Sequence, residues 1–147
     1  MSDLTAFKIS MDAFKDKVDL AGIPYRFHIN RVAANFDMGS TLSAIAYLHD
    51  ILEDCHEWNS QRLSEQFNPV VVNAVVALTK IKGEDYTVYL NRVAQNENAT
   101  KVKIADLRDN MDISRFKRPL TEKDFERLKK YHNAYLFLLE KQTQFKS

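Results

Sequence analysis

Residues 46–54 form an apolar helical run that contains an adjacent histidine and aspartate, His49 and Asp50. An ionisable pair inside such a run costs free energy unless something compensates it, and a bound cation is one compensator. On a continuous α-helix His49 lies four residues before Glu53, and Asp50 lies four residues before Asp54. The spacing therefore predicts that all four side chains lie on one flank of a helix.

Helical periodicity continues through the rest of the chain, in which glycine and proline occur only three times each. Apolar residues repeat at intervals of three and four, which is typical of amphipathic helices rather than of a turn-rich β protein. Predicted helices cover residues 4–18, 28–37, about 42–54, 60–67, 70–80 and 86–93, then a helix capped by Asn98 that carries Asp106, and a long closing helix after a capping box at Thr121. The sequence predicts an all-α single domain over residues 1–147, with about seven to nine helices.

Composition narrows the classes of protein to which this chain can belong. Hydrophobic residues make up 45% of the chain, which is typical of a globular domain, and the net charge of +1 gives no field that favours nucleic acid. Cys55 is the only cysteine, so no internal disulfide framework is expected. No run approaches the ~20 apolar residues of a membrane span, and the first residues lack an apolar signal core. We therefore expect a cytoplasmic protein with neither a membrane nor a nucleic acid as partner.

Two other segments supply residues that a metal centre at His49 and Asp50 would need. His28 ends the upstream segment PYRFH, and Asp106 lies in the downstream segment VKIADLRDNMD. The resulting order H…HD…D resembles that of the HD-domain phosphohydrolases. With the segments LHDILED, ALTK and GEDYTVYL, the chain from about Pro24 to Tyr131 resembles the hydrolase domain of the RelA/SpoT family, in particular its small stand-alone members.

The resemblance implies a compact HD-type helical bundle with one divalent metal ion. It assigns metal ligation to His28, His49, Asp50 and Asp106. Imidazoles with carboxylates suit manganese, iron or zinc, and manganese is the cofactor that we expect. Taken alone, His28 is better interpreted as a capping or hydrogen-bonding histidine, and Asp106 could be an ordinary surface carboxylate of a helix, although its apolar neighbours make a solvated position less natural.

The resemblance also implies catalytic and substrate-binding residues. Glu53 and Asp54 match an acidic pair that handles the protons of the attacking water and the leaving group, although acidic residues at a helix end can simply face solvent. Substrate contacts are expected from Tyr86, Lys103, Asn110, Arg127 and Tyr131. Each of these five has a structural alternative, either as a core aromatic or as a contact within or between helices.

The implied activity is removal of the 3′-pyrophosphate from ppGpp or pppGpp, which gives GDP or GTP and pyrophosphate. One departure concerns the substrate: Asp19 and Leu20 occupy the positions of an Arg-Lys pair that contacts the guanine end in better-known members. Two alternatives therefore remain open at this point. The chain could be a phosphohydrolase for another phosphorylated nucleotide or dinucleotide cofactor, or a nucleotide-binding module without turnover.

Overall fold

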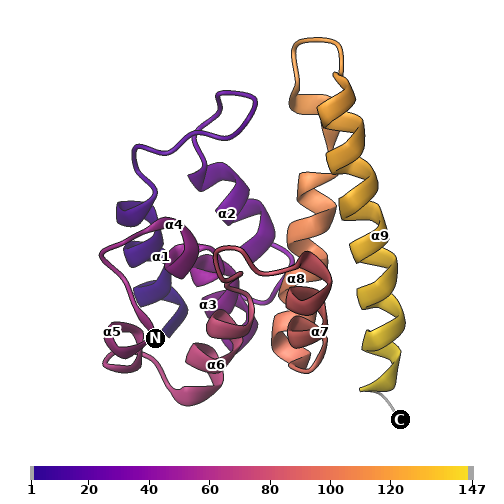
Figure 1. Cartoon of the computed structure of the whole chain (residues 1–147). Coiled ribbons are helices and arrows are strands. Elements are labelled where there is room, and N and C mark those ends of the chain that lie inside the picture. The colour runs from indigo at the N-terminus through magenta and orange to yellow at the C-terminus, as the bar shows by residue number, and fades with distance from the viewer. Residues whose placement is uncertain (1, 146–147) are drawn as a thin grey trace.

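The computed structural model describes residues 2–145, and in these residues the chain forms nine α-helices and one 3-10 helix without any β-strand (Figure 1). The helices are α1 (Ser2–Ala13), α2 (Arg26–Ala33), α3 (Thr41–Leu48), α4 (Ile51–Asp54), α5 (Ser60–Ser64), α6 (Pro69–Ala77), α7 (Tyr86–Ala94), α8 (Glu97–Asn110) and α9 (Glu122–Gln144), with η1 (Ile113–Arg115) between α8 and α9. The predicted all-α fold is confirmed.

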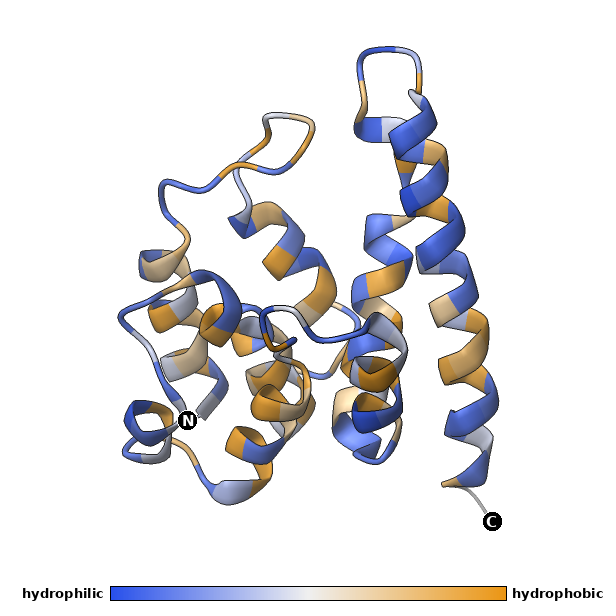
Figure 2. Cartoon of the chain, in the orientation of Figure 1, coloured by the Kyte–Doolittle hydropathy of each residue, from blue (hydrophilic) through white to orange (hydrophobic). Residues whose placement is uncertain are grey.

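Helix α3 lies at the centre of the bundle and contacts α1, α2, α6 and α8. Its residues Ala44, Ile45, Ala46 and Leu48 are fully buried. The long helix α9 runs along one side of the molecule and packs on α7 and α8 (Figure 1). Apolar residues face the interior between the helices, while hydrophilic residues cover much of α9 (Figure 2). The first half of the chain thus surrounds α3, and α7, α8 and α9 form a second group beside it.

Local capping signals determine where several helices begin. Asn68 accepts a hydrogen bond from the Val71 amide at 3.1 Å, and Pro69 occupies the first turn, where its missing N–H leaves no bond unmade. The capping box predicted at Thr121 is present, with Asp124 as its second member. The cap of α8 is Asn96 rather than the predicted Asn98, so this helix begins earlier than expected.

Helix α1 differs from its prediction in length and in its buried face. It ends at Ala13 rather than Val18, because the chain then turns and Val18 forms an isolated bridge with Pro24. The fully buried residues of α1 include Ala6 and Ser10, which are small enough to allow close packing on α3. The predicted helix over residues 4–18 was therefore too long, and its predicted apolar face was wrong in part.

Replacing Leu138 with alanine should lower the free energy of unfolding by about 2–5 kcal/mol, the usual cost of truncating a buried leucine. Leu138 is fully buried and anchors α9 to the rest of the bundle. Leu136 on the same helix is 50% exposed, so Leu136→Ala should cost much less. Urea unfolding of both variants checks this prediction, and equal losses would contradict it.

In the part of the chain that the structure describes, no helix combines the length and the hydropathy needed to cross a lipid bilayer.

Candidate metal centre

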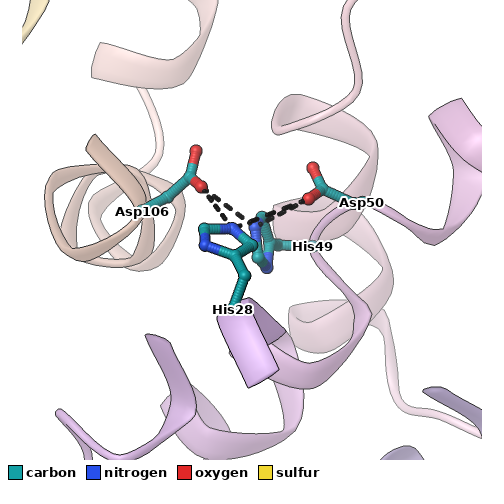
Figure 3. Close-up of side chains that lie close together, drawn as sticks. All are labelled: His28, His49, Asp50 and Asp106. Carbon is teal, nitrogen blue, oxygen red and sulfur yellow. Dashed lines mark hydrogen bonds and ion pairs between the residues drawn. The ribbon is translucent and has the colours of Figure 1, made fainter. Parts of the chain in front are cut away.

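Four side chains from three separate parts of the chain converge in the interior of the bundle (Figure 3). His28 comes from α2, His49 and Asp50 from the junction of α3 and α4, and Asp106 from α8. One donor atom from each residue lies within 4.8 Å of the donor atoms of the other three. Two imidazoles and two carboxylates at this separation form a donor set that could hold a divalent cation.

The helix that carries His49 and Asp50 is interrupted at these two residues, which corrects the prediction of one continuous helix. The His49 Nδ1 atom lies 2.6 Å from the carbonyl oxygen of Ala46, which in a regular helix would accept from the amide of Asp50. Asp50 has φ −104° and ψ 0°, outside the α-helical region. In a continuous helix the side chains of consecutive residues point in clearly different directions. The break removes this constraint, so the side chains of His49 and Asp50 can both point into one site.

The donor atoms approach one another closely without forming a full set of hydrogen bonds. His28 Nε2 lies 2.9 Å from Asp106 Oδ1, and His49 Nε2 lies 3.1 Å from Asp50 Oδ2. Nevertheless, the buried His28 Nε2 has no hydrogen bond of acceptable geometry with any described residue. A buried polar atom without a partner is costly, so its position among three other donors fits a bound cation.

The second nitrogen of each histidine is held by a neighbouring group. His49 Nδ1 is held by the Ala46 carbonyl, and His28 Nδ1 lies 2.6 Å from Asp109 Oδ2. Asp109 also accepts two hydrogen bonds from Arg31, at 2.7 and 3.1 Å. Burial alone would raise the pKa of Asp109, but hydrogen bonds from His28 and Arg31 lower it to about 2, so this carboxylate stays charged. Such contacts leave Nε2 of each ring available as the metal ligand.

Sequence reasoning missed Asp109 and Arg31, as well as Tyr25, whose hydroxyl donates to Asp50. Asp109 follows the predicted ligand Asp106 by three residues and therefore shares its helix face, which is the signal that could have identified it. Arg31 likewise follows the predicted ligand His28 by three residues, so the same signal applies to it.

The carboxylate of Asp106 is contacted by two of the residues predicted to bind substrate. Lys103 Nζ donates to Asp106 Oδ2 at 2.9 Å, and Asn110 Nδ2 donates to Asp106 Oδ1 at 3.1 Å. Burial alone would raise the pKa of Asp106, but the charge of Lys103 and the histidines hold it well below its usual value. Asp106 is therefore kept as an anion at the centre of the cluster.

The two predicted catalytic acids lie in different surroundings. Glu53 lines the pocket beside the cluster and accepts a hydrogen bond from the Lys80 amide at 3.1 Å. Burial and the charge of Asp50 raise the pKa of Glu53, although part of the residue is exposed. Asp54 pairs with Lys17 at 2.7 Å and does not line this pocket. The catalytic roles of both residues remain predictions.

A pocket of about 520 Å³ opens beside the cluster. Three of the four candidate ligands line it, namely His28, Asp50 and Asp106, while His49 lies behind them. The same pocket is lined by all five residues predicted to bind substrate, which are Tyr86, Lys103, Asn110, Arg127 and Tyr131. Its volume falls within the ~300–1,000 Å³ that is typical of small-molecule sites.

Replacing Asp109 with asparagine should weaken divalent metal binding about 10–100-fold, because His28 loses the carboxylate that orients its ring. Calorimetric titration of the metal-free protein with manganese measures this change in affinity. Asp112→Asn is the matched control, since Asp112 lies one turn further on and contacts Arg115 but none of the four candidate ligands. Unchanged affinity in the Asp109 variant would contradict the assignment.

The fold is similar to that of a known hydrolase. One similar solved structure is that of a metazoan orthologue of SpoT, which hydrolyses ppGpp and plays a role in starvation responses. The match covers 97% of this chain and 92% of the solved chain, with a TM-score of 0.73 and 17% sequence identity. No protein-family model matches the chain, and no curated protein matches it by sequence. The chain therefore has the helical fold of a SpoT-like ppGpp hydrolase, together with a His/Asp cluster that is compatible with the metal site of an HD domain.

Proposed function

We propose that this protein is a divalent-metal-dependent phosphohydrolase with manganese as its metal. The observation that carries the proposal is the convergence of His28, His49, Asp50 and Asp106 beside a pocket that three of them line. We assign metal ligation to these four residues, which can leave coordination positions open for water and a phosphate oxygen. A divalent cation held there would polarise a phosphoryl group and lower the pKa of a water ligand.

The residues around the cluster support proton transfer and charge stabilisation. Glu53 is within one turn of Asp50, and a raised pKa suits a carboxylate that exchanges protons near neutral pH. In our proposal Glu53 accepts a proton from the attacking water and then delivers it to the leaving oxygen. In our proposal Lys103 and Asn110, which contact Asp106, bind phosphate or ribose oxygens beside it.

We further propose that the substrate is ppGpp or pppGpp. The water oxygen would bond to the phosphorus attached to O3′, the O3′–P bond would break, and O3′ would be protonated. The products would be GDP or GTP with pyrophosphate. Support comes from the structural similarity to a protein that hydrolyses ppGpp and from the pocket, which is lined by tyrosines and basic residues.

The test is steady hydrolysis of ppGpp by purified protein with added manganese, with pyrophosphate and GDP measured as products. Removal of metal with a chelator should stop the reaction, and manganese should restore it. Tight ppGpp binding without turnover in any divalent metal would instead support a nucleotide-binding module.

A second candidate keeps the reaction but changes the substrate to another phosphorylated nucleotide or dinucleotide cofactor. The observation that favours it is Asp19, which lines the pocket where a cation was expected. The Asp19 carboxylate accepts hydrogen bonds from the Ala21 and Ile23 amides at 2.8 and 3.0 Å, so it stabilises the loop and offers no positive charge to a substrate. A panel of 2′-, 3′- and 5′-phosphorylated nucleotides assayed side by side separates the candidates, and turnover of ppGpp alone would eliminate this one.

A further inference from the structure

The basic residues of the pocket differ in whether a carboxylate already neutralises them. Most are paired: Lys17 with Asp54, Arg31 with Asp109, Lys103 with Asp106, Arg115 with Asp112 and Arg127 with Asp124. Lys80 and Lys130 also line the pocket, and neither makes an ion pair with any of residues 2–145. These two lysines are therefore the pocket cations that are free to bind an incoming anion.

Lys80 and Lys130 belong to the same part of the pocket although they lie far apart in the sequence. Lys130 projects from α9 across the ring of Tyr86, with its Nζ 4.1 Å from the ring centroid. Lys80 follows α6, and its backbone amide binds Glu53. Lys103, which lines the same pocket, has its Nζ 5.5 Å from the ring centroid of Tyr89, and the Tyr89 and Tyr86 rings lie 5.7 Å apart. In keeping with this arrangement, burial and the charges of Lys80 and Lys103 lower the pKa of the Lys130 amine.

No carboxylate among residues 2–145 forms an ion pair with Lys80 or Lys130. The Glu84 carboxylate, the acidic group nearest to Lys80 in the sequence, is paired with Arg92. Lys103 donates to Asp106, so its charge is shared with the candidate metal centre. The hydroxyl of Tyr86, whose ring Lys130 covers, is buried without a hydrogen-bond partner in residues 2–145. Cations without a carboxylate partner, beside a free hydroxyl donor, form an arrangement that suits phosphate groups.

We propose that Lys80 and Lys130 form a second phosphate subsite, separate from the metal centre, which binds a phosphoryl group of the substrate that is not cleaved. Lys103 contacts Asp106 of the candidate metal centre and lies over Tyr89, whose ring is next to the Tyr86 ring that Lys130 covers. This inference deepens the proposed function and rests on it. It restricts the substrate class to molecules with two separated phosphoryl groups, one at the metal centre and one between these lysines.

The first experiment tests the subsite without any turnover. Inorganic pyrophosphate is titrated calorimetrically into full-length protein in the presence of a chelator, so that no metal takes part in binding. Lys130→Met should weaken pyrophosphate binding by about 10–100-fold, the loss that corresponds to one charge-assisted hydrogen bond. Lys130→Arg should restore most of the affinity, and Lys80→Met should show a similar loss.

Lys129→Met is the matched control, since Lys129 is the adjacent residue on α9 and does not line the pocket. It should bind pyrophosphate as the wild type does. Equal binding by wild type, Lys129→Met and Lys130→Met would overturn the subsite, as would absence of binding to the wild type. Circular dichroism of each variant confirms that its helices are retained.

The second experiment uses kinetics with manganese. Lys130→Met should raise KM for ppGpp about tenfold or more with little change in kcat. The same variant should not alter KM for guanosine 3′-diphosphate, the analogue of ppGpp that lacks the 5′-phosphates. An equal rise in KM for both substrates would count against the subsite. A third outcome separates the two proposals. If the wild type turns over no substrate but binds pyrophosphate in the presence of chelator, and Lys130→Met binds it more weakly, then the hydrolase proposal fails while the phosphate subsite stands.

Discussion

Asp106→Asn should leave a protein without bound metal and with kcat/KM reduced at least about 1,000-fold, which corresponds to roughly 4 kcal/mol of transition-state stabilisation. Asp106 Oδ1 lies 2.9 Å from His28 Nε2 and 3.3 Å from His49 Nε2, so this carboxylate bridges the two imidazoles. The substitution also leaves the Lys103 ammonium without its anion, and this charge would repel a cation from the site. Metal analysis of the purified variant and the rate of ppGpp hydrolysis in manganese measure both effects.

The control for Asp106→Asn is Asp85→Asn, the same chemical change at an exposed residue. Asp85 caps α7 through its side chain, a role that asparagine also fills. Wild-type metal content and turnover are expected for this control. Full metal occupancy together with wild-type turnover in Asp106→Asn would remove the basis of the proposed mechanism.

Glu53→Gln should lower kcat about 10²–10⁴-fold, the range expected when a general acid–base residue is lost. Glu53 contacts neither imidazole, so metal content should stay at the wild-type level. The amide keeps the shape of the side chain and its hydrogen bond to the Lys80 amide but cannot accept a proton at neutral pH. Single-turnover rates with saturating manganese isolate the chemical step from binding.

Asp54→Asn is the comparison that separates the two acids. Asp54 pairs with Lys17 and does not line the pocket, so its substitution should lower kcat less than Glu53→Gln does. An equal or larger loss in Asp54→Asn would show that the assignment of proton transfer to Glu53 is wrong.

The parts of the fold that were predicted from sequence depend on partners close by in the chain. Asn68 caps the Val71 amide and Thr121 pairs with Asp124, so each contact spans three residues and its pattern is visible in the sequence. The end of α1 was misplaced because it depends on distant contacts. The Lys17 carbonyl accepts from the Tyr25 amide, and the Lys17 side chain reaches Asp54.

The candidate site follows the same rule. The order of histidines and aspartates along the chain indicated the four residues that meet in the structure. Their geometry could not be predicted, because the helix breaks at His49 and Asp50, and His49 contacts Asp106, which lies 57 residues away in the sequence. The spacing of Asp109 from Asp106 indicates a shared helix face, but the contact of Asp109 with His28, 81 residues away, is visible only once α2 and α8 are packed together.

The pocket residues on α9 lie on a different helix from all four candidate ligands, and this separation has a consequence for how such a protein can diversify. The four candidate ligands lie on α2, α8 and the junction of α3 and α4, whereas α9 supplies Arg127, Lys130 and Tyr131 to the pocket and none of those ligands. If the proposed function holds, mutations in α9 would change which molecule is bound without replacing any candidate metal ligand. Substrate preference could then evolve faster in this architecture than the reaction itself.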